Sequence, residues 1–510
     1  MQRHLSLLPL RLVFASILLA AFPAVAQTPG PAASPAPAGS PALFADDGVA
    51  SLFTSATPGG LTADAVAARA VKTSHEVRAQ GEAQEAALAG VSEARAAFVP
   101  RLSGIARYTR LSPLEQPSLG NLVAVGPTVP AGQIAAGTPL FAVPLTFPVI
   151  EDQYVTQATL SLPVSDYLYR LPKVFASARG NARAAALLEQ ATAVRVAADA
   201  RIAYYDWLRA RLQAEVAERS LAQAQAHLKD VTVSSTSGVA SKADVLRVES
   251  QVAAAELLLT RARSATLVAE ERLRTLMHDR GAERYAVGES LEQASVAGDL
   301  LQNARRPLEE LAAEAFTRRL EPRALRESAE AAQAQAGAQR AAGMPRLDAV
   351  GNAYYSRPNQ RVFPQEDEFR GTWDVGLQLT WAPTDIFGTE AGRRATLAKS
   401  RELEAERQQL ADGITVEVTQ ARQALLDSAV AISSANRGLV AAEESYRVRR
   451  VLFQHGRATS VELTDAEIEQ VRAQLEAITT RIDQRVATVR LRHALGLDVG
   501  AVETPRPGRP

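Results

Sequence analysis

The chain of 510 residues contains no cysteine, which excludes disulfide bonds, thiolate metal sites, cysteine nucleophiles and a lipidated N-terminal cysteine. Aromatic residues make up only 5% of the sequence, although 47% of it is hydrophobic. This composition favours thin elements packed through alanine over a thick core of large rings. Lys+Arg and Asp+Glu balance at 56 each, so the excess positive charge typical of nucleic-acid-binding proteins is missing.

Sequence motifs of enzymes and metal sites are also missing. There is no Walker-type Gly-Lys loop, no Gly-x-Ser-x-Gly and no His-Glu-x-x-His. The histidines that follow His4 are scattered, without an i, i+4 pair: His75, His227, His278, His455 and His493. We therefore expect no catalytic residue, no cofactor and no metal.

The first 26 residues have the features of a secretory signal peptide. Arg3 and Arg11 precede a stretch over residues 12–21 that is apolar except for Ser16, and Ala24-Val25-Ala26 has the form of a cleavage site. About ten apolar residues are too few for a membrane-spanning helix, which needs about 20. Residues 27–60 are rich in Pro and Ala and predict a flexible lead-in, and residues 498–510 predict a similar tail.

The remaining sequence contains one pattern twice. Residues 97–102 are echoed by residues 342–347 at an offset of 245 positions, whereas residues 160–162 and 377–379 are 217 apart. The offset decreases across residues 112–153. This segment is rich in Pro and Gly, which predicts a longer loop in the first copy. We call residues 61–280 the first repeat and residues 307–497 the second repeat, with a connector over residues 281–306 that we expect to form a side domain.

Each repeat predicts the order helix, strand, loop, strand, long helix, turn and helix. Good helix formers fill residues 62–98 and 307–342, and Pro307 suits a first helical position. Alternating residues predict strands near residues 100–111, 154–164, 346–356 and 372–382. Helices of about 60 residues are expected over 173–233 and 392–454. Turns follow at 234–241 and 455–460.

The helices after these turns have apolar residues at 3-4 spacing, which is typical of a coiled-coil seam. Each must therefore return antiparallel along its long helix. We expect the returning helix of the first repeat, 241–277, to lie end to end with the opening helix of the second, 307–342. Four strands are too few for a closed membrane barrel, so several chains would have to share one.

The signal peptide, the duplicated order, the Pro-Arg-Leu strand entries and the turns at Gly238 and Gly456 closely resemble the TolC-like outer-membrane efflux proteins, over residues 61–497. The resemblance implies a mainly α fold with a small β part. It also implies a homotrimer whose α-helical barrel continues into a 12-stranded outer-membrane β-barrel, with four strands from each chain. The helical tunnel would lie in the periplasm.

The function that this resemblance implies is a passive exit duct for efflux or secretion. Such a duct contacts outer-membrane lipid and docks a periplasmic adaptor (membrane fusion) protein and an inner-membrane transporter of the RND, ABC or MFS type. The sequence does not select among drugs, solvents, metals, polysaccharide and protein as cargo. The alternatives are a periplasmic coiled-coil adaptor and a spacer protein without a channel, which the two-repeat layout and the four strands oppose.

The two turns have clear local chemistry. Glycine supplies a positive φ that ends each long helix, Ser241 can cap the next helix with Asp244 as partner, and Thr459 or Ser460 can cap the last one. An ordinary helix-turn-helix role accounts for these residues. The resemblance adds an adaptor-docking role for the tip residues Gly238, Val239, Ala240, Ser241, Gly456, Ala458, Thr459 and Ser460.

Acidic residues follow both turns. In the family that the sequence resembles, the position of Asp244 helps to close the periplasmic entrance, and those of Glu462 and Asp465 form acidic rings. Close carboxylates from three chains would attract cations. The alternative role is that of solvated first-turn carboxylates, which the helix dipole favours.

The sequence departs from the family pattern at two positions of the entrance. Phe453 stands where the family's best-known members have a tyrosine that bonds the aspartate, and Ala458 stands where they have an arginine. We therefore expect Arg457 to pair with Asp244.

Two groups of aromatic residues also need an interpretation. Tyr204, Tyr205 and Trp207 suit either an inter-helix packing cluster or the upper tunnel, and packing is favoured. A second group lies near the ends of strands, as in an interfacial aromatic belt, although strands favour aromatic residues in any case: Tyr108, Tyr154, Tyr354, Tyr355, Trp373 and Trp381.

Overall fold

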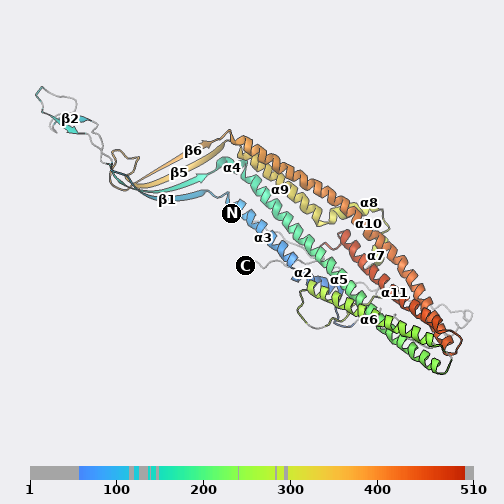
Figure 1. The fold of residues 1–510 in the computed structure, drawn as a ribbon. Coiled ribbons are helices and arrows are strands. Elements are labelled where there is room, and N and C mark those ends of the chain that lie inside the picture. Colours follow the sequence, from blue (N-terminus) through green and yellow to red (C-terminus); the bar gives the residue numbers. More distant parts are fainter. Residues whose placement is uncertain are drawn as a thin grey trace, which may run out of the picture. The chain divides into compact units, whose positions relative to one another are not determined.

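The computed structural model describes residues 57–113, 120–125, 136–137, 139–144, 149–238, 240–281, 284–291 and 297–499 (Figure 1). They all belong to one compact unit of the chain, residues 49–510. The expected signal peptide, most of the expected lead-in and all but two residues of the expected tail lie outside the described residues. Among the described helices, none has a stretch that is long and apolar enough to cross a membrane.

The duplicated order predicted from the sequence is confirmed. The first repeat contains α2 (Ala63–Thr73), α3 (His75–Ala96), β1 (Arg101–Arg110), β4 (Asp152–Leu162), α4 (Val164–Leu168), α5 (Leu171–Thr236) and α6 (Lys242–Leu276). The second contains α8 (Leu308–Arg318), α9 (Leu320–Ala342), β5 (Arg346–Arg357), β6 (Arg370–Thr380), α10 (Asp385–Gln454) and α11 (Ser460–Ala494). In the connector, α7 spans Ala297–Asn303.

Three local expectations need correction. The opening helix of each repeat is broken, at Ser74 and at Arg319, where the backbone is extended. The Ser74 side chain accepts hydrogen bonds from the N–H groups of Glu76 and Val77 and so starts a new helix. Pro307 is the N-cap of α8 and not its first helical residue. The long loop of the first repeat contains two paired strands, β2 (Asn121–Val125) and β3 (Leu140–Pro144).

The main sheet has the strand order β1-β4-β5-β6, and all pairs are antiparallel. One face is apolar and open: Trp373, Val375, Leu377 and Leu379 of β6 are each at least 69% exposed. The other face carries polar side chains, where Asn352 donates to Asp374 at 2.9 Å. Among the described residues, β1 and β6 are each paired on one side only, so both outer edges of this sheet have unpaired backbone groups.

The strand register separates the strand aromatics into two sets. Tyr154 pairs with Tyr108, and their ring centroids are 5.0 Å apart on the apolar face. Tyr354 pairs with Thr372 and therefore lies on the polar face, where the guanidinium of Arg361 is 4.3 Å from its ring centroid. Tyr354 is therefore not on the apolar face with the others, because neighbouring residues of a strand point to opposite faces.

The helices form a fixed sequence of neighbours. α5 packs against α6, α11, α9, α3 and α2, whereas α10 packs against α11, α9 and α8. α5 and α11 thus lie inside the chain, and α6 and α10 lie at its two edges. α10 directly follows the edge strand β6, and α3, which lies end to end with α6, directly precedes the edge strand β1. The sheet and the helices therefore have the same two edges.

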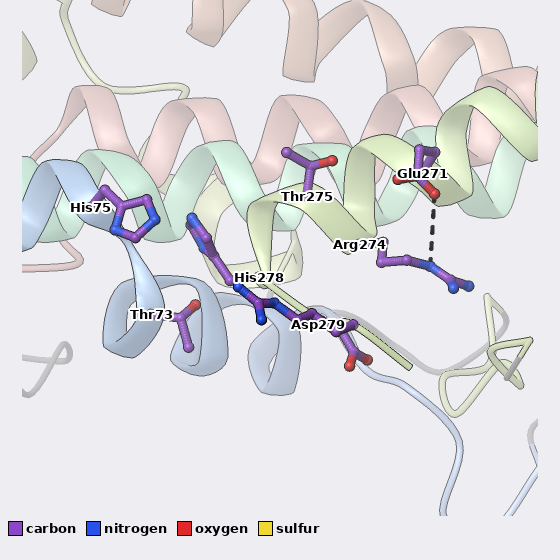
Figure 2. A pocket seen from close by; sticks show the side chains of 8 residues that line it. Thr73, His75, Glu271, Arg274, Thr275, His278 and Asp279 are labelled. Carbon is purple, nitrogen blue, oxygen red and sulfur yellow. Dashed lines mark ion pairs between the residues drawn. The ribbon is translucent and has the colours of Figure 1, made fainter. Parts of the chain in front are cut away.

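The helix that returns from each turn lies end to end with the opening helix of its own repeat. Thr73 Oγ1 donates to the carbonyl oxygen of Met277 at 3.1 Å, and the rings of His75 and His278 are 4.4 Å apart where α6 meets α3 (Figure 2). α11 meets the break between α8 and α9 in the same way, since Gly496 lies against Arg318 and Arg319. The expected pairing of α6 with the second repeat's opening helix is wrong, because the returning helix continues along the long helix of its own repeat.

The centre of the first repeat is a packed aromatic cluster. Tyr204, Tyr205 and Trp207 are 0%, 6% and 1% exposed, which confirms the packing interpretation. The Tyr204 hydroxyl donates to the carbonyl oxygen of Leu61 at 2.8 Å, and that of Tyr205 to Glu289 Oε1 at 3.0 Å. Burial raises the pKa of both phenols, so both hydroxyls keep their protons as donors.

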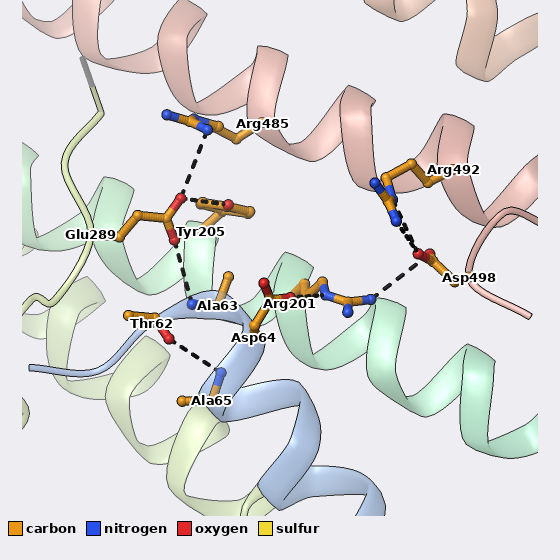
Figure 3. Close-up of polar contacts among 10 residues, drawn as sticks. All are labelled: Thr62, Ala63, Asp64, Ala65, Arg201, Tyr205, Glu289, Arg485, Arg492 and Asp498. Atoms are coloured by element: carbon orange, nitrogen blue, oxygen red, sulfur yellow. Dashed lines mark hydrogen bonds and ion pairs between the residues drawn. The ribbon is translucent and has the colours of Figure 1, made fainter. Parts of the chain in front are cut away.

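A set of charged residues lies near Tyr205 of this cluster (Figure 3). Glu289 of the connector also lies 3.8 Å from Arg485 of α11. Asp498, which is 1% exposed, accepts a hydrogen bond from Arg492 Nε at 3.1 Å and lies 3.8 Å from Arg201 of α5. These contacts fix α5, α11, the connector and the residues after α11 to one another.

Candidate functional site

The first helix turn has the geometry that its sequence predicts. Gly238 has φ +76° and donates its N–H to the carbonyl oxygen of Ser235 at 3.0 Å, which ends α5. Ser241 caps α6: its Oγ accepts from the Asp244 N–H at 3.2 Å, while Asp244 Oδ2 accepts from the Ser241 N–H at 3.0 Å. This capping box confirms the predicted pair. Val239 lies outside the described residues.

The second turn uses the same chemistry. Gly456 has φ +68°, and the Arg457 N–H reaches back to the carbonyl oxygen of Leu452 at 2.8 Å. The cap of α11 is Thr459 rather than Ser460, because Thr459 exchanges hydrogen bonds with Glu462 in a second capping box. Both turns therefore end one helix and start the next through local bonds.

These bonds favour the charged form of both acids. The hydrogen bonds from the Ser241 side chain and backbone hold the pKa of Asp244 below its usual range. The Thr459 backbone N–H does the same for the pKa of Glu462, helped by Arg449, whose guanidinium is 3.7 Å from the carboxylate. Both groups are therefore anionic across the physiological pH range.

The remaining predicted entrance residues occupy different environments. Asp465 and Arg457 are exposed. Within the part of the single chain that the structure describes, no ion pair joins Arg457 to Asp244, whose carboxylate is bonded to Ser241. Phe453 is half-buried and packs its ring edge-on against His227, with the centroids 5.4 Å apart.

A buried polar cluster next to the second turn was not found from the sequence. His227 of α5, Ser460 of α11 and Glu467 of α11 are 4%, 6% and 5% exposed. His227 Nδ1 lies 3.1 Å from Glu467 Oε2, and its Nε2 lies 3.3 Å from Ser460 Oγ. Ser460 therefore faces His227 in this structure and not the solvent, so it is not an exposed tip residue. No sequence signal pointed to this set, because its members are up to 240 positions apart.

The described residues contain no group of three or more His, Asp or Glu side chains that is arranged to hold a metal ion. The described parts of the site are two capped turns, with first-turn carboxylates that are exposed at Glu462 and half-buried at Asp244, and a buried contact behind the second turn. Joined to paired long helices and to a four-stranded sheet with one apolar face, they have the organisation expected for a chain of the TolC-like type.

The comparison with family models gives the same class. The model described as "Outer membrane efflux protein" matches residues 66–277 and 311–497, which include most of both repeats. The chain belongs to this family. No curated protein matches the chain significantly.

Solved structures show the same fold. VceC of Vibrio cholerae is 15% identical, with a TM-score of 0.65 over 85% of this chain and 96% of VceC. The Campylobacter jejuni channel CmeC is 12% identical, with a TM-score of 0.65 over 89% and 90% of the two chains. The open state of Neisseria gonorrhoeae MtrE is 17% identical, with a TM-score of 0.65 over 88% and 91%.

Proposed function

We propose that this protein is the outer-membrane exit duct of an efflux or secretion system, with its helices forming a tunnel in the periplasm. The single observation that carries this proposal is the family match, because it extends over both repeats, 66–277 and 311–497. A periplasmic adaptor or a spacer without a channel is not favoured, since the matched family consists of outer-membrane efflux proteins.

The duct is proposed to be a homotrimer. The sheet of one chain leaves β1 and β6 with an unpaired edge, and lipid cannot satisfy the free N–H and C=O groups. Three chains would close a barrel of about twelve strands, within the size range of outer-membrane barrels. The helices support the same closure, because apolar side chains at least half exposed lie on the edge helix α6 (Leu246, Leu257, Leu267 and Val268) and on the edge helix α10 (Val416, Val430 and Val440).

The proposed partners are a periplasmic adaptor at the turns and an inner-membrane transporter beyond it. The turns suit docking because Ser241, Gly456 and Thr459 are exposed and the capping boxes hold their backbone. Gly238, Val239, Ala240 and Ala458 complete the proposed docking tip, and Ser460 is left out because His227 covers it. Residues 1–26 are proposed to be a secretory signal peptide.

The mass of the protein extracted by detergent from separated membranes tests this proposal. Light scattering coupled to gel filtration should give about three chains, and the protein should come from the outer-membrane fraction. A monomer in the periplasmic fraction would contradict the duct and favour the spacer.

The entrance is proposed to be closed at the turns, with Asp244, Glu462 and Asp465 as its acidic residues and Phe453 and Arg457 beside them. The charged state of Asp244 and Glu462 supports this role, because like charges brought together by three chains attract cations. The variant Asp244→Ala/Glu462→Ala should show a higher single-channel conductance in planar bilayers. Unchanged conductance would remove both residues from the entrance.

A further inference from the structure

The contact between His227 and α11 is the starting point. His227 belongs to the first repeat, whereas Ser460 and Glu467 belong to the second, and Phe453 of α10 packs on the same ring. Three helices therefore meet at one imidazole, just behind the second turn. Buried polar groups normally serve a fixed geometry, because a partner lost from such a cluster leaves a buried group unsatisfied.

Each ring nitrogen of His227 has a hydrogen-bond partner. When Nδ1 carries the proton, it donates to the Glu467 carboxylate at 3.1 Å, and Nε2 accepts from the Ser460 hydroxyl at 3.3 Å. A doubly protonated ring keeps both contacts, with Ser460 as the acceptor. His227 therefore holds two residues of α11 that are two helical turns apart.

The spacing of these residues fixes the rotation of α11. At about 100° per residue, Ser460, Thr464 and Glu467 fall within about 60° of one another on the helix circumference. Glu462 and Asp465 fall about 140° to 200° away from Ser460 on the same scale. Burial agrees with this division, since the first three residues are buried and the two acids are exposed. The His227 contact thus lies on one side of α11 and the proposed entrance acids lie on the other.

Among the described residues of the single chain, the first turn makes no such contact. The glycines of the two turns are 218 positions apart, so the counterparts of His227, Ser460 and Glu467 are Ser445, Lys242 and Glu249. All three counterparts are exposed. The buried cluster is therefore a property of the α5–α11 packing and not of the repeated hairpin.

We propose that His227 is a positioning residue of the periplasmic entrance: by holding Ser460 and Glu467, it keeps α11 docked on α5 so that Glu462 and Asp465 point away from α5. This proposal rests on the proposed duct function. Loss of the contact frees the first two turns of α11 to rotate or move from α5, and the entrance opens. The two capping boxes are unaffected, because their bonds are local to each turn.

Single-channel recording of the purified protein in planar bilayers tests this role. His227→Ala and Glu467→Ala should each raise the occupancy of the open state about tenfold, the factor that corresponds to losing one hydrogen bond to a charged group. The double variant should open no more than the stronger single variant, because both changes remove the same contact. Glu467→Gln should stay close to wild type, since the amide oxygen still accepts from Nδ1.

Two further variants complete the test. Ser445→Ala, at the counterpart position of the second repeat, is the matched control and should conduct like wild type. If His227→Ala does not assemble, Phe453→Leu tests the same contact without leaving a buried charge unpaired, and it should also raise open-state occupancy. Wild-type conductance in Phe453→Leu, Glu467→Ala or an assembled His227→Ala would overturn the positioning role. Absence of any pore from the wild-type protein would instead contradict the duct function.

Discussion

The returning helices of the two repeats have the same length but opposite surroundings. α6 and α11 each span 35 residues, begin at a capping box and carry apolar residues at coiled-coil spacing. α11 buries fifteen residues within the chain, whereas α6 buries four. The difference arises because α11 lies between α5 and α10, while α6 packs mainly on α5. Similar hairpins therefore become an interior helix and an edge helix according to their place in the chain.

The largest expected effect concerns the edge helix. Leu267 of α6 is 60% exposed in the single chain and is expected to be covered by α10 of a neighbouring chain. Leu267→Glu should prevent trimer formation, because it buries an unpaired charge in each interface. Burying such a charge costs about 3 kcal/mol or more. Light scattering of the detergent-extracted protein measures the mass, and Leu267→Met is the volume-conserving control. A stable trimer of the Glu variant would show that α6 is not an interface helix.

The interior helix should respond differently. Ile482 of α11 is 0% exposed within the chain. Ile482→Ala should lower the free energy of unfolding by about 2–5 kcal/mol through the cavity that it leaves. The trimer should still form at low temperature, but hydrogen exchange along α5 and α11 should accelerate. If the variant instead lost its trimer and kept its exchange protection, the assignment of α11 to the interior would be wrong.

The ends of the same two helices differ in a smaller way. The residue after the C-cap has a positive φ in both, +48° at His278 after α6 and +67° at Gly496 after α11. Gly496→Ala should destabilise the end of α11 by about 1–2 kcal/mol, because a Cβ there is strained and would meet Arg318 Cβ at 3.1 Å. His278→Gly should change stability by less than about 1 kcal/mol, since relief of backbone strain offsets loss of the His75 contact.

Hydrogen exchange at the last turns of α6 and α11 distinguishes these two outcomes. Exchange should accelerate in Gly496→Ala and change little in His278→Gly. An equal response of both ends would show that the close approach to Arg318 does not matter.

The smallest expected effect concerns pH at the turns. The pKa values of Asp244 and Glu462 are lower in the folded chain than in the unfolded chain. The stabilising contribution of the two carboxylates is therefore complete at pH values above the usual carboxyl pKa near 4. It is lost as the pH falls through their lowered pKa values in the folded chain. Exchange of the first turns of α6 and α11, corrected for the intrinsic rate at each pH, should accelerate only in acid.

Ser241→Ala is the matched control for this effect. It should accelerate exchange in α6 at neutral pH and leave α11 unchanged, because each capping box is local. A pH response that persisted at α6 in Ser241→Ala would mean that the capping box is not its source.

Local interactions explain what could be predicted. The turn glycines, the Ser241–Asp244 box and the alternation in β6 depend on neighbours within a few positions, so the sequence contains them directly. The break in the first opening helix was missed because one hydroxyl, that of Ser74, decides it. The break at Arg319 has no side-chain cap that a sequence could reveal. The pairing of α6 with α3 was missed because helix lengths alone fit two arrangements.

By itself, the sequence determined the two repeats, their order of helices and strands, and the cap of the first turn, since periodicity and capping act over a few residues. For the second turn it left Thr459 and Ser460 open as caps, and the structure has Thr459. Only the tertiary structure decided which helix is interior, which acids face away from α5 and which histidines meet. His75 and His278 are 203 positions apart and His227 and Glu467 are 240 apart. Contacts at such separations follow from how long helices pack, and each helix has several faces on which a partner can lie.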